Sequence, residues 1–250
     1  DNTRIIVTGK ALDVLPGLEK LPYKINYFDK EGNPTSKPEM TKPIPEGMNK
    51  NTVIEGYFEA IGGADKIKAL NSTLVTYEAS AMGNTILSTE KRTATHYTNE
   101  MSMGGNVVMK VVMSKDGVFM NKQPLPAPMA NEMTNTLGTF TEMGLLANEN
   151  SLLTGIEPVD GKDAYVISTK GEIVSTAIYF DVATGLKVKE VQTISMQGQK
   201  QNQEAFFSDC KEFNGVKFPG IKTGSVGPQV VNFILIDAKV NEGITPADFE

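Results

Sequence analysis

The feature that most constrains the fold is a long succession of short, apolar-alternating segments between residues 73 and 240. Turn signals such as Gly83-Asn84, Asp116-Gly117 and Asn214-Gly215 separate these segments. Short strands joined by tight turns at this spacing are typical of a meandering antiparallel sheet that curls on itself. The expected strands are 73–82, 85–97, 99–103, 106–115, 118–122, 163–169, 172–181, 186–196, 202–213, 216–226 and 229–240.

One segment interrupts the strands and has the spacing of a helix. Between Pro128 and Leu146, four apolar residues fall on one helical face, and Pro128 suits the first turn. These residues are Met129, Met133, Leu137 and Phe140. An amphipathic helix inserted between strands must cover an apolar surface, and the concave side of the sheet offers one. The sequence therefore predicts a mainly β, α+β fold: an unclosed β-barrel curled around a helical lid.

The chain divides into two units near residue 45. Residues 1–45 predict a strand at 4–8, a helix at 11–21, a strand at 23–28 and then a proline-rich linker. Such a strand–helix–strand appendage is too small to bury both faces of its own sheet.

Residues 46–250 form the second expected unit. It opens with a helix capped by Asn51 and stopped by Gly62-Gly63, and a short helix follows at 64–70. The strands and the inserted helix complete this unit, so we expect it to fold as one domain.

A methionine-rich tract at 101–120 places most of its large apolar side chains on every second residue. Because strand side chains alternate between the two faces of a sheet, this parity predicts one continuous apolar surface. Methionine is flexible and polarizable, and it suits surfaces that accept apolar partners of varied shape. An ordinary sheet core is the alternative explanation. The expected surface residues are Met101, Met103, Val107, Met109, Val111 and Met113.

Composition excludes several classes of partner. The net charge of −6 and the scattered basic residues argue against nucleic acid, which requires a basic face, and against a polybasic membrane patch. No apolar stretch approaches the roughly 20 residues that span a bilayer. The opening residues lack a signal-peptide pattern, so we expect the numbering to begin inside a mature or truncated protein.

The inventory of catalytic residues is small. His96 is the only histidine and Cys210 the only cysteine, so neither a histidine pair nor a cysteine cluster can hold zinc. No nucleophile elbow, phosphate-binding loop or dinucleotide fingerprint occurs. Asp160-Gly161 is better explained as a hairpin turn than as part of a calcium loop. The sequence therefore predicts a chain without a catalytic site, a metal or a cofactor.

Residues 50–250 resemble the lipoprotein-carrier fold of LolA, LolB and their relatives, an unclosed β-barrel over a helical lid. The resemblance lies in patterns of turns and alternation. It rests on VIEGYFEAIGGADKIKAL at 53–70, VDGKDAYVIS at 159–168, YFDVATGLKVKE at 179–190, FNGVKFPGIKTG at 213–224 and ILIDAKVNEGITPADF at 234–249.

The first 45 residues are similar to the last strand–helix–strand of insulinase/pitrilysin-type zinc peptidases. The phrase INYFDKEGNPTSKP at 25–38 is typical of the bacterial branch, where such a segment can precede a carrier-like module. The H-x-x-E-H zinc motif of that family is absent, so no metal ligand or general base can be assigned. The resemblance implies the C-terminal part of a larger exported protein, periplasmic or associated with the cell envelope.

Two functions from different classes are compatible with the sequence. The first is a binding module whose concave sheet and helix 128–146 enclose a lipid, an acyl chain or an apolar peptide. The ligand-binding residues would be the six of the methionine tract together with Met129, Met133, Leu137 and Phe140. The second is a structural or docking module that positions the peptidase or its substrate and has no ligand of its own.

Overall fold

The computed structural model describes residues 4–9, 11–37, 42–196, 198–227 and 229–250. The helices are α1 (Ala11–Leu18), α2 (Lys50–Ile61), α3 (Ala64–Lys68), α4 (Ala127–Met133) and α5 (Thr141–Ala147), with 3-10 turns η1 (Thr134–Thr136) and η2 (Pro246–Phe249). The strands are β1 (Tyr27–Phe28), β2 (Pro34–Thr35), β3 (Ser72–Ala81), β4 (Asn84–Thr93), β5 (His96–Met103), β6 (Asn106–Ser114), β7 (Gly117–Met120), β8 (Gln123–Pro124), β9 (Ser151–Val159), β10 (Lys162–Thr169), β11 (Val174–Asp181), β12 (Lys187–Met196), β13 (Gln199–Ser208), β14 (Lys211–Phe213), β15 (Val216–Phe218), β16 (Ile221–Val226) and β17 (Gln229–Val240).

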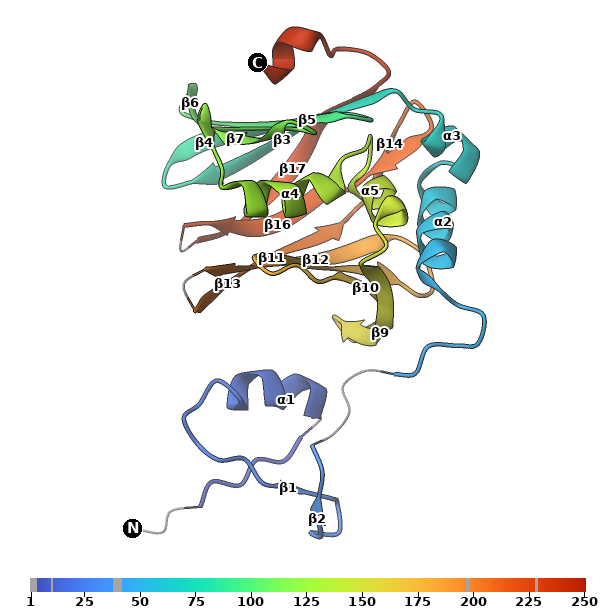
Figure 1. Ribbon diagram of the computed structural model, residues 1–250. Helices are drawn as coiled ribbons and strands as arrows, with labels where there is room; N and C mark the ends of the chain where they lie inside the picture. The colour runs from blue at the N-terminus through green and yellow to red at the C-terminus, as the bar shows by residue number, and fades with distance from the viewer. Residues whose placement is uncertain (1–3, 10, 38–41, 197, 228) are drawn as a thin grey trace.

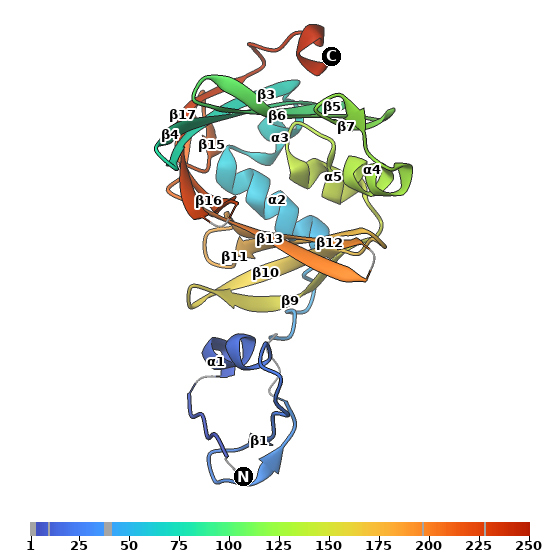
Figure 2. The same cartoon turned by 90° about the vertical axis from the view of Figure 1, so that its left-hand side faces the viewer.

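Thirteen strands form one curled antiparallel sheet. Their order is β8-β7-β6-β5-β4-β3-β17-β16-β13-β12-β11-β10-β9, so the first and last long strands of the barrel, β3 and β17, pair near its middle. The two halves of the sheet face each other across α2, α4 and α5 (Figures 1 and 2). Within the described residues, β8 and β9 stand at opposite ends of the order and do not pair. The predicted unclosed barrel around a helical lid is confirmed.

Tight turns join most neighbouring strands, as the sequence predicts. Asp160 and Gly161 link β9 to β10, and both have left-handed backbone angles, with φ of 48° and 78°. A two-residue hairpin turn of this type needs φ > 0 at both central positions, which Asp-Gly tolerates well. The expectation of a hairpin turn at this site is therefore confirmed. Strand β9 itself is absent from the predicted strands, because Gly155 and Pro158 interrupt its apolar alternation.

Helix α2 packs its apolar face into the core at one end of the curled sheet. Its N-cap is Asn49, whose side chain accepts hydrogen bonds from the backbone N–H groups of Asn51 and Thr52, so the predicted cap at Asn51 is two residues late. Gly62 and Gly63 end the helix as expected, both with positive φ. The helix buries one apolar stripe, which consists of Val53, Ile54, Tyr57, Phe58 and Ile61.

The single helix predicted at 128–146 is wrong: the segment forms α4, η1 and α5 in succession. Leu137 is extended and Gly138 has a φ of 146°, so the backbone leaves the helical region between η1 and α5. A β-carbon on Gly138 would lie 2.8 Å from the carbonyl oxygen of Phe140, which leaves no room for a side chain. The break at glycine separates the first half of the predicted apolar face from Phe140.

Residues 4–9 and 11–37 lie outside the curled sheet (Figure 1). They form α1 and the short β1–β2 hairpin, while residues 4–8, predicted as a strand, form no strand. A bridge between Lys42 and Ile156 joins the linker to β9, and Lys42 Nζ lies 2.7 Å from Asp163 Oδ2. These contacts involve exposed side chains and one short stretch of backbone.

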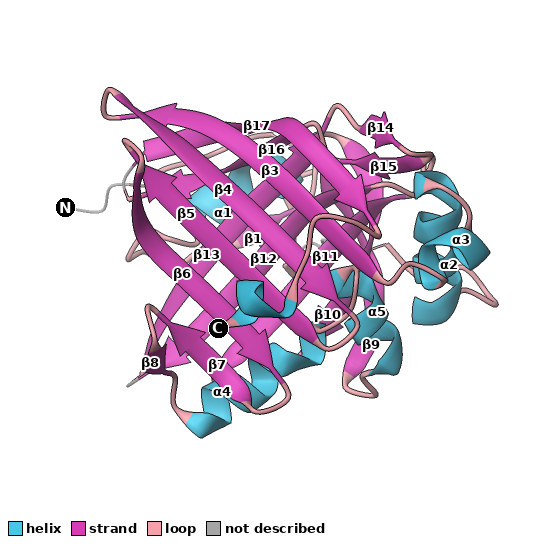
Figure 3. Ribbon diagram, turned by 90° about the horizontal axis from the view of Figure 1, so that it is seen from above, coloured by secondary structure: helices cyan, strands magenta, loops and turns pink. Residues whose placement is uncertain are grey.

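The C-terminal segment crosses the outer, convex face of the sheet over β5 (Figure 3). Asp248 pairs with Lys91, and the Phe249 ring lies 5.1 Å from the ring of His96. His96 therefore packs in a surface contact. In the parts of the chain described, no helix has the length and apolar character needed to cross a membrane.

Candidate functional site

A cavity of about 190 Å³ lies between the inner, concave face of the sheet and the helices. Its walls come from α2, from the segment leading into α5, and from strands on both halves of the sheet. The lining residues are Tyr57, Thr73, Val75, Tyr77, Glu90, Arg92, Tyr97, Thr139, Phe140, Thr141, Glu142, Lys187, Glu190, Phe207, Phe218, Pro219 and Lys222. The wall is thus partly aromatic and partly charged.

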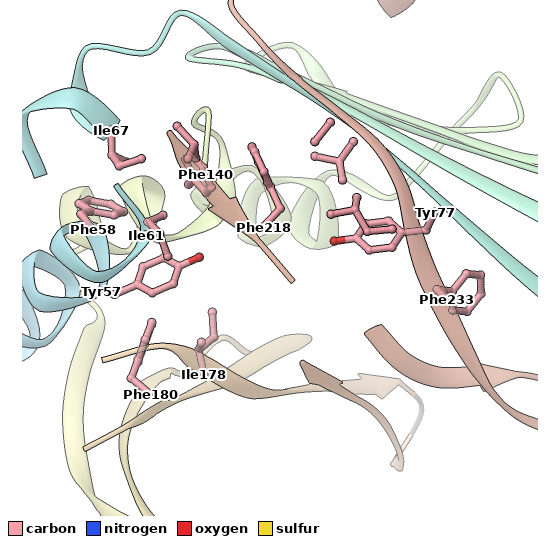
Figure 4. Packing of buried hydrophobic residues seen from close by; sticks show 14 of the residues in the cluster. Tyr57, Phe58, Ile61, Ile67, Tyr77, Phe140, Ile178, Phe180, Phe218 and Phe233 are labelled. Carbon is pink, nitrogen blue, oxygen red and sulfur yellow. The ribbon is translucent and has the colours of Figure 1, made fainter. Parts of the chain in front are cut away.

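Aromatic side chains form the apolar part of the wall (Figure 4). The rings of Phe140 and Phe218 stack with centroids 5.8 Å apart, and Tyr57 packs against Phe180 at 5.3 Å. Burial raises the pKa of Tyr57 well above its ordinary value. Because rigid rings present large apolar surfaces at low entropic cost, this wall suits a flat or flexible apolar group.

Charged side chains form the rest of the wall. The binding residues predicted from the sequence include no charged side chain. Lys222 Nζ lies 2.9 Å from Glu90 Oε1. Lys187 Nζ lies 2.9 Å from Glu142 Oε1, in an ion pair without well-aligned hydrogen-bond geometry, and 3.7 Å from Glu190 Oε2. Buried charges are costly unless paired, and these pairs meet that requirement.

Three cations of the cavity act on the pKa of Glu90. Burial alone would raise the pKa of this carboxyl, but the charges of Lys222, Arg92 and Lys187 outweigh it and lower the pKa to about 2. The pKa of Lys222 is raised, first of all by Glu90. The pair is therefore ionised throughout the neutral range.

Arg92 differs from the two lysines because it faces neutral groups. Its guanidinium carbon lies 4.1 Å from the centroid of the Tyr97 ring, in cation–π contact, and Nη1 donates to the carbonyl oxygen of Thr136 at 3.3 Å. Among the described residues, no carboxylate lies within ion-pair distance of Arg92. Arg92 thus influences Glu90 through its charge but forms no ion pair of its own among the described residues.

The methionine tract lies mainly on the inner face, as its parity predicts. Met101 and Met103 pack against the main core, and Met109 packs in a second cluster between β6 and α4. Val111 and Met113 are buried in the same second cluster. Packing of this kind fits both an apolar binding surface and an ordinary core.

Val107 departs from the predicted apolar surface. The register of β5 and β6 shifts between Met101 and Ser102, so Met109 pairs with Met101 whereas Val107 pairs with Ser102. Directly paired residues share a face, and Ser102 points opposite to Met101. The bulge therefore moves Val107 to the outer face, where it is 56% exposed. The prediction that Val107 belongs to the continuous inner surface is wrong.

The four residues predicted from the helical segment do not lie together. Met133 and Leu137 pack on the cluster that contains Met113, and Met129 is half-buried on α4. Phe140 instead belongs to the main core and lines the cavity. Of the ten predicted ligand-binding residues, the structure places Phe140 in the cavity wall and most of the others beside α4 and β6.

Helix α4 spans the open side of the curled sheet and contacts a strand on each side, β7 and β11. Its apolar face packs on β7, while the Glu132 carboxylate accepts three backbone hydrogen bonds from the start of β11 and the two residues before it. The donors are Glu172 at 2.7 Å, Ile173 at 3.0 Å and Val174 at 2.6 Å. A β-carbon on Gly171 would lie 2.6 Å from this carboxyl group, so glycine leaves room for it. We refer to these contacts as the Glu132 latch.

Strand parity carries a signal for the charged residues that a search for apolar alternation overlooks. In β4, Ile86 and Ser88 are buried on the inner face, and Glu90 and Arg92 share their parity. In β12, Glu190 likewise lies on the inner face, because it pairs with the buried Ile178 of β11. A charged residue in phase with buried neighbours indicates a polar feature inside a barrel.

The described residues contain no group of three or more His, Cys, Asp or Glu side chains placed to hold a metal ion. Cys210 is half-buried, and burial raises the pKa of its thiol, which makes the reactive thiolate less available. The side chains that converge in the cavity are thus ion pairs and aromatic rings.

No protein-family model matches the chain, and no curated protein matches it either. Among solved structures, it is similar to a LolA superfamily protein from Nitrosomonas europaea, with 12% identity and a TM-score of 0.51, over 82% of this chain and 98% of that chain. A DUF1329 family protein from Desulfovibrio piger matches with 12% identity and a TM-score of 0.48, over 80% and 96% of the two chains. At this identity the first likeness speaks to the fold alone: residues of this chain build a LolA-like curled sheet around a helical lid.

Proposed function

We propose that this chain is a non-catalytic binding module that holds a hydrophobic ligand, a lipid, acyl chain or apolar peptide, beneath α4 and α5. The observation that carries the proposal is the cavity of about 190 Å³ on the concave face, with aromatic rings in its wall. Small-molecule sites are typically concave, and this one combines aromatic rings with charged groups that could fix the orientation of a ligand. The LolA-like fold supports the same assignment.

The methionine side chains extend the proposed site beyond the cavity. Met101, Met103 and Met109 lie on the inner face of β5 and β6, next to the strands that line the cavity. Their flexible thioethers can rearrange around an apolar tail. A ligand longer than the cavity would therefore run along this methionine surface, under α4.

The test is a titration with the neutral apolar probe N-phenyl-1-naphthylamine, followed by displacement with fatty acids and alkanols. Val75 lines the cavity on β3, and Val75→Trp should fill it and weaken probe binding at least tenfold. The control is Val230→Trp, because Val230 is 72% exposed and does not line the cavity. This control should bind as the parent does.

An absence of saturable probe binding by the parent chain would favour the alternative, a structural or docking module. Under that alternative the ion pairs and rings simply complete a packed interior, and Val75→Trp would lower stability without affecting any ligand. Equal probe binding by both tryptophan variants would place the ligand outside this cavity.

We also propose that the chain is the C-terminal part of a larger zinc-peptidase-like protein, exported to the periplasm or cell envelope. The support is the resemblance of residues 1–45 to the last strand–helix–strand of insulinase/pitrilysin-type peptidases. The remainder of that peptidase would then be the module's partner, and residues 1–45 would belong to the partner's domain. Sequencing the genomic region upstream of Asp1 for an H-x-x-E-H-containing domain in the same reading frame tests this proposal.

A further inference from the structure

The cavity contains one cation, Arg92, that forms no ion pair of its own among the described residues, although its charge acts on nearby Glu90. Lys222 and Lys187 each face a glutamate at 2.9 Å, whereas Arg92 contacts the Tyr97 ring and the carbonyl oxygen of Thr136. A guanidinium carries five N–H donors in a planar fork that matches a carboxylate or phosphate. One of the five is used by Thr136, and Arg92 lines the cavity.

A second polar group points into the same space. Tyr57 is 3% exposed, yet its hydroxyl points away from α2 toward the interior (Figure 4). The neighbouring Tyr77 hydroxyl donates to the carbonyl oxygen of Pro219, but the Tyr57 hydroxyl forms no comparable bond with the described residues. A buried hydroxyl usually has a partner, so this one is available to a ligand.

Each carboxylate of the cavity faces a lysine, although Glu142 and Glu190 share one. Glu90 pairs with Lys222, and Glu142 and Glu190 both face Lys187. A cationic ligand would have to displace a lysine from each of them. An anionic ligand finds Arg92 with open donors and a hydroxyl donor at Tyr57, without displacing an acid.

We propose that the cavity selects an amphiphile with an anionic head, a carboxylate or a phosphate, that binds Arg92 and is oriented by the Tyr57 hydroxyl. The apolar body of this ligand lies against Phe140 and Phe218 and continues toward the methionine surface. This inference rests on the proposed binding function and narrows it to one class of ligand. Charge-assisted, bidentate contacts would supply the selectivity.

The experiment compares four ten-carbon ligands by competition with N-phenyl-1-naphthylamine: decanoate, decyl phosphate, decanol and decyltrimethylammonium. The parent chain should bind the two anions at least tenfold more tightly than decanol, and the ammonium most weakly. Arg92→Met should abolish this preference while decanol binding stays unchanged. Tyr57→Phe, which keeps the ring, should weaken decanoate by threefold or more and leave decanol unaffected.

A matched control exists on the outer face. Lys189 also stacks on aromatic rings, 5.0 Å from Phe206 and 5.5 Å from Tyr179, but does not line the cavity. Lys189→Met should therefore retain the anion preference, and thermal melts of all variants identify any that fail to fold. Arg92→Lys should keep part of the preference for anions, because lysine keeps the positive charge but lacks the planar, forked set of donors of the guanidinium.

The outcomes separate the two proposals. If decanol and decanoate bind equally, or if Arg92→Met keeps the preference, the head-group inference fails while the binding function stands. If acetate or inorganic phosphate binds as tightly as decanoate, the ligand is a small anion and the amphiphile is excluded. If none of the four ligands binds, both proposals fail together.

Discussion

Lys222 of β16 and Glu90 of β4 form an ion pair across the inner face of the sheet, spanning the two intervening strands β3 and β17, with 2.9 Å between Nζ and Oε1. The Glu90 side chain is 19% exposed. A pair in this position fixes two strands that share no backbone hydrogen bonds. It also makes the stability of the fold sensitive to pH.

Replacing Glu90 by glutamine should destabilise the fold by roughly 3 kcal/mol at pH 7, because Lys222 is left without its acid and the depressed pKa of Glu90 no longer contributes. The Glu90 pKa of about 2 lies below its ordinary value of 4.5. Its contribution is therefore complete above pH 4.5 and is lost as the pH falls towards 2. Urea unfolding at several pH values measures the difference between parent and variant, which should narrow over this range.

The control for this prediction is the surface pair of Lys68 and Glu55, whose side chains are 45% and 40% exposed. Glu55→Gln should cost less than about 1 kcal/mol, since exposed ion pairs contribute little. A Glu90→Gln variant as stable as Glu55→Gln would show that the interior pair is solvated in solution.

The Glu132 latch should protect the loop before β11 from solvent exchange. Glu132→Ala removes the acceptor of three backbone N–H groups, so hydrogen–deuterium exchange at Glu172, Ile173 and Val174 should accelerate at least tenfold. Probe entry, followed by stopped-flow fluorescence, should accelerate as well. Glu149→Ala, at an exposed site near the end of α5, serves as the control.

Gly171→Ala should also disturb the latch, because the added methyl group would lie 2.6 Å from the Glu132 carboxyl group and closer still to the carbonyl oxygen of Val174, so that the backbone there must shift too. Unchanged exchange in both Glu132→Ala and Gly171→Ala would mean that α4 is held by its packing on β7 alone.

The bulge in the β5–β6 pairing predicts opposite consequences for two residues of equal parity. Met109→Asp should destabilise the fold by about 2–4 kcal/mol, because it places an unpaired charge beside the buried Val111. Val107→Asp should stay within about 0.5 kcal/mol of the parent, because that side chain is on the exposed outer face. Denaturant titrations of the two variants provide the comparison, and equal losses would contradict the observed register.

Removal of residues 1–45 should leave the cooperative melt of the remaining chain largely intact. The links between this segment and the curled sheet include the Lys42–Asp163 ion pair, with side chains 64% and 43% exposed, and one backbone bridge to β9. Exposed ion pairs of this kind contribute little to stability. A parallel deletion of residues 1–37 keeps Lys42 and separates its effect from that of α1 and the hairpin. Failure of both truncated chains to fold would show that this segment is part of the folded domain and that the boundary near residue 45 is wrong.

The curled sheet is predictable from the sequence because its evidence is local. A turn such as Asp160-Gly161 depends on the backbone preferences of two residues, and the stripe of α2 depends on spacing alone. Wherever alternation is unbroken, as in β3 and β17, the expected and observed strands agree within a few residues. The predicted ends of helices and strands differ more from the observed ones, because neighbouring residues such as Asn49 and Asn51 can both serve as a helix cap.

The character of the site is less predictable because it arises from contacts distant in sequence. Glu90 meets Lys222, and Lys187 meets Glu142, only once the sheet has curled. The bulge that moves Val107 outward likewise depends on the pairing of two strands and leaves the one-strand parity pattern unchanged. The sequence therefore predicts an apolar surface where the interior combines rings with charges.

The Glu132 latch connects the two halves of the sheet beside α4. Helix α4 lies on β7 near one end of the strand order and reaches the loop before β11 near the other, so one side chain spans the last gap between the two walls. Its length limits how far apart the walls can stand at this point without breaking these hydrogen bonds. Aspartate, shorter by one methylene, would draw them together or lose contact, and a longer reach would widen the mouth. The spacing of the two walls beside α4 therefore depends in part on the side chain at this position.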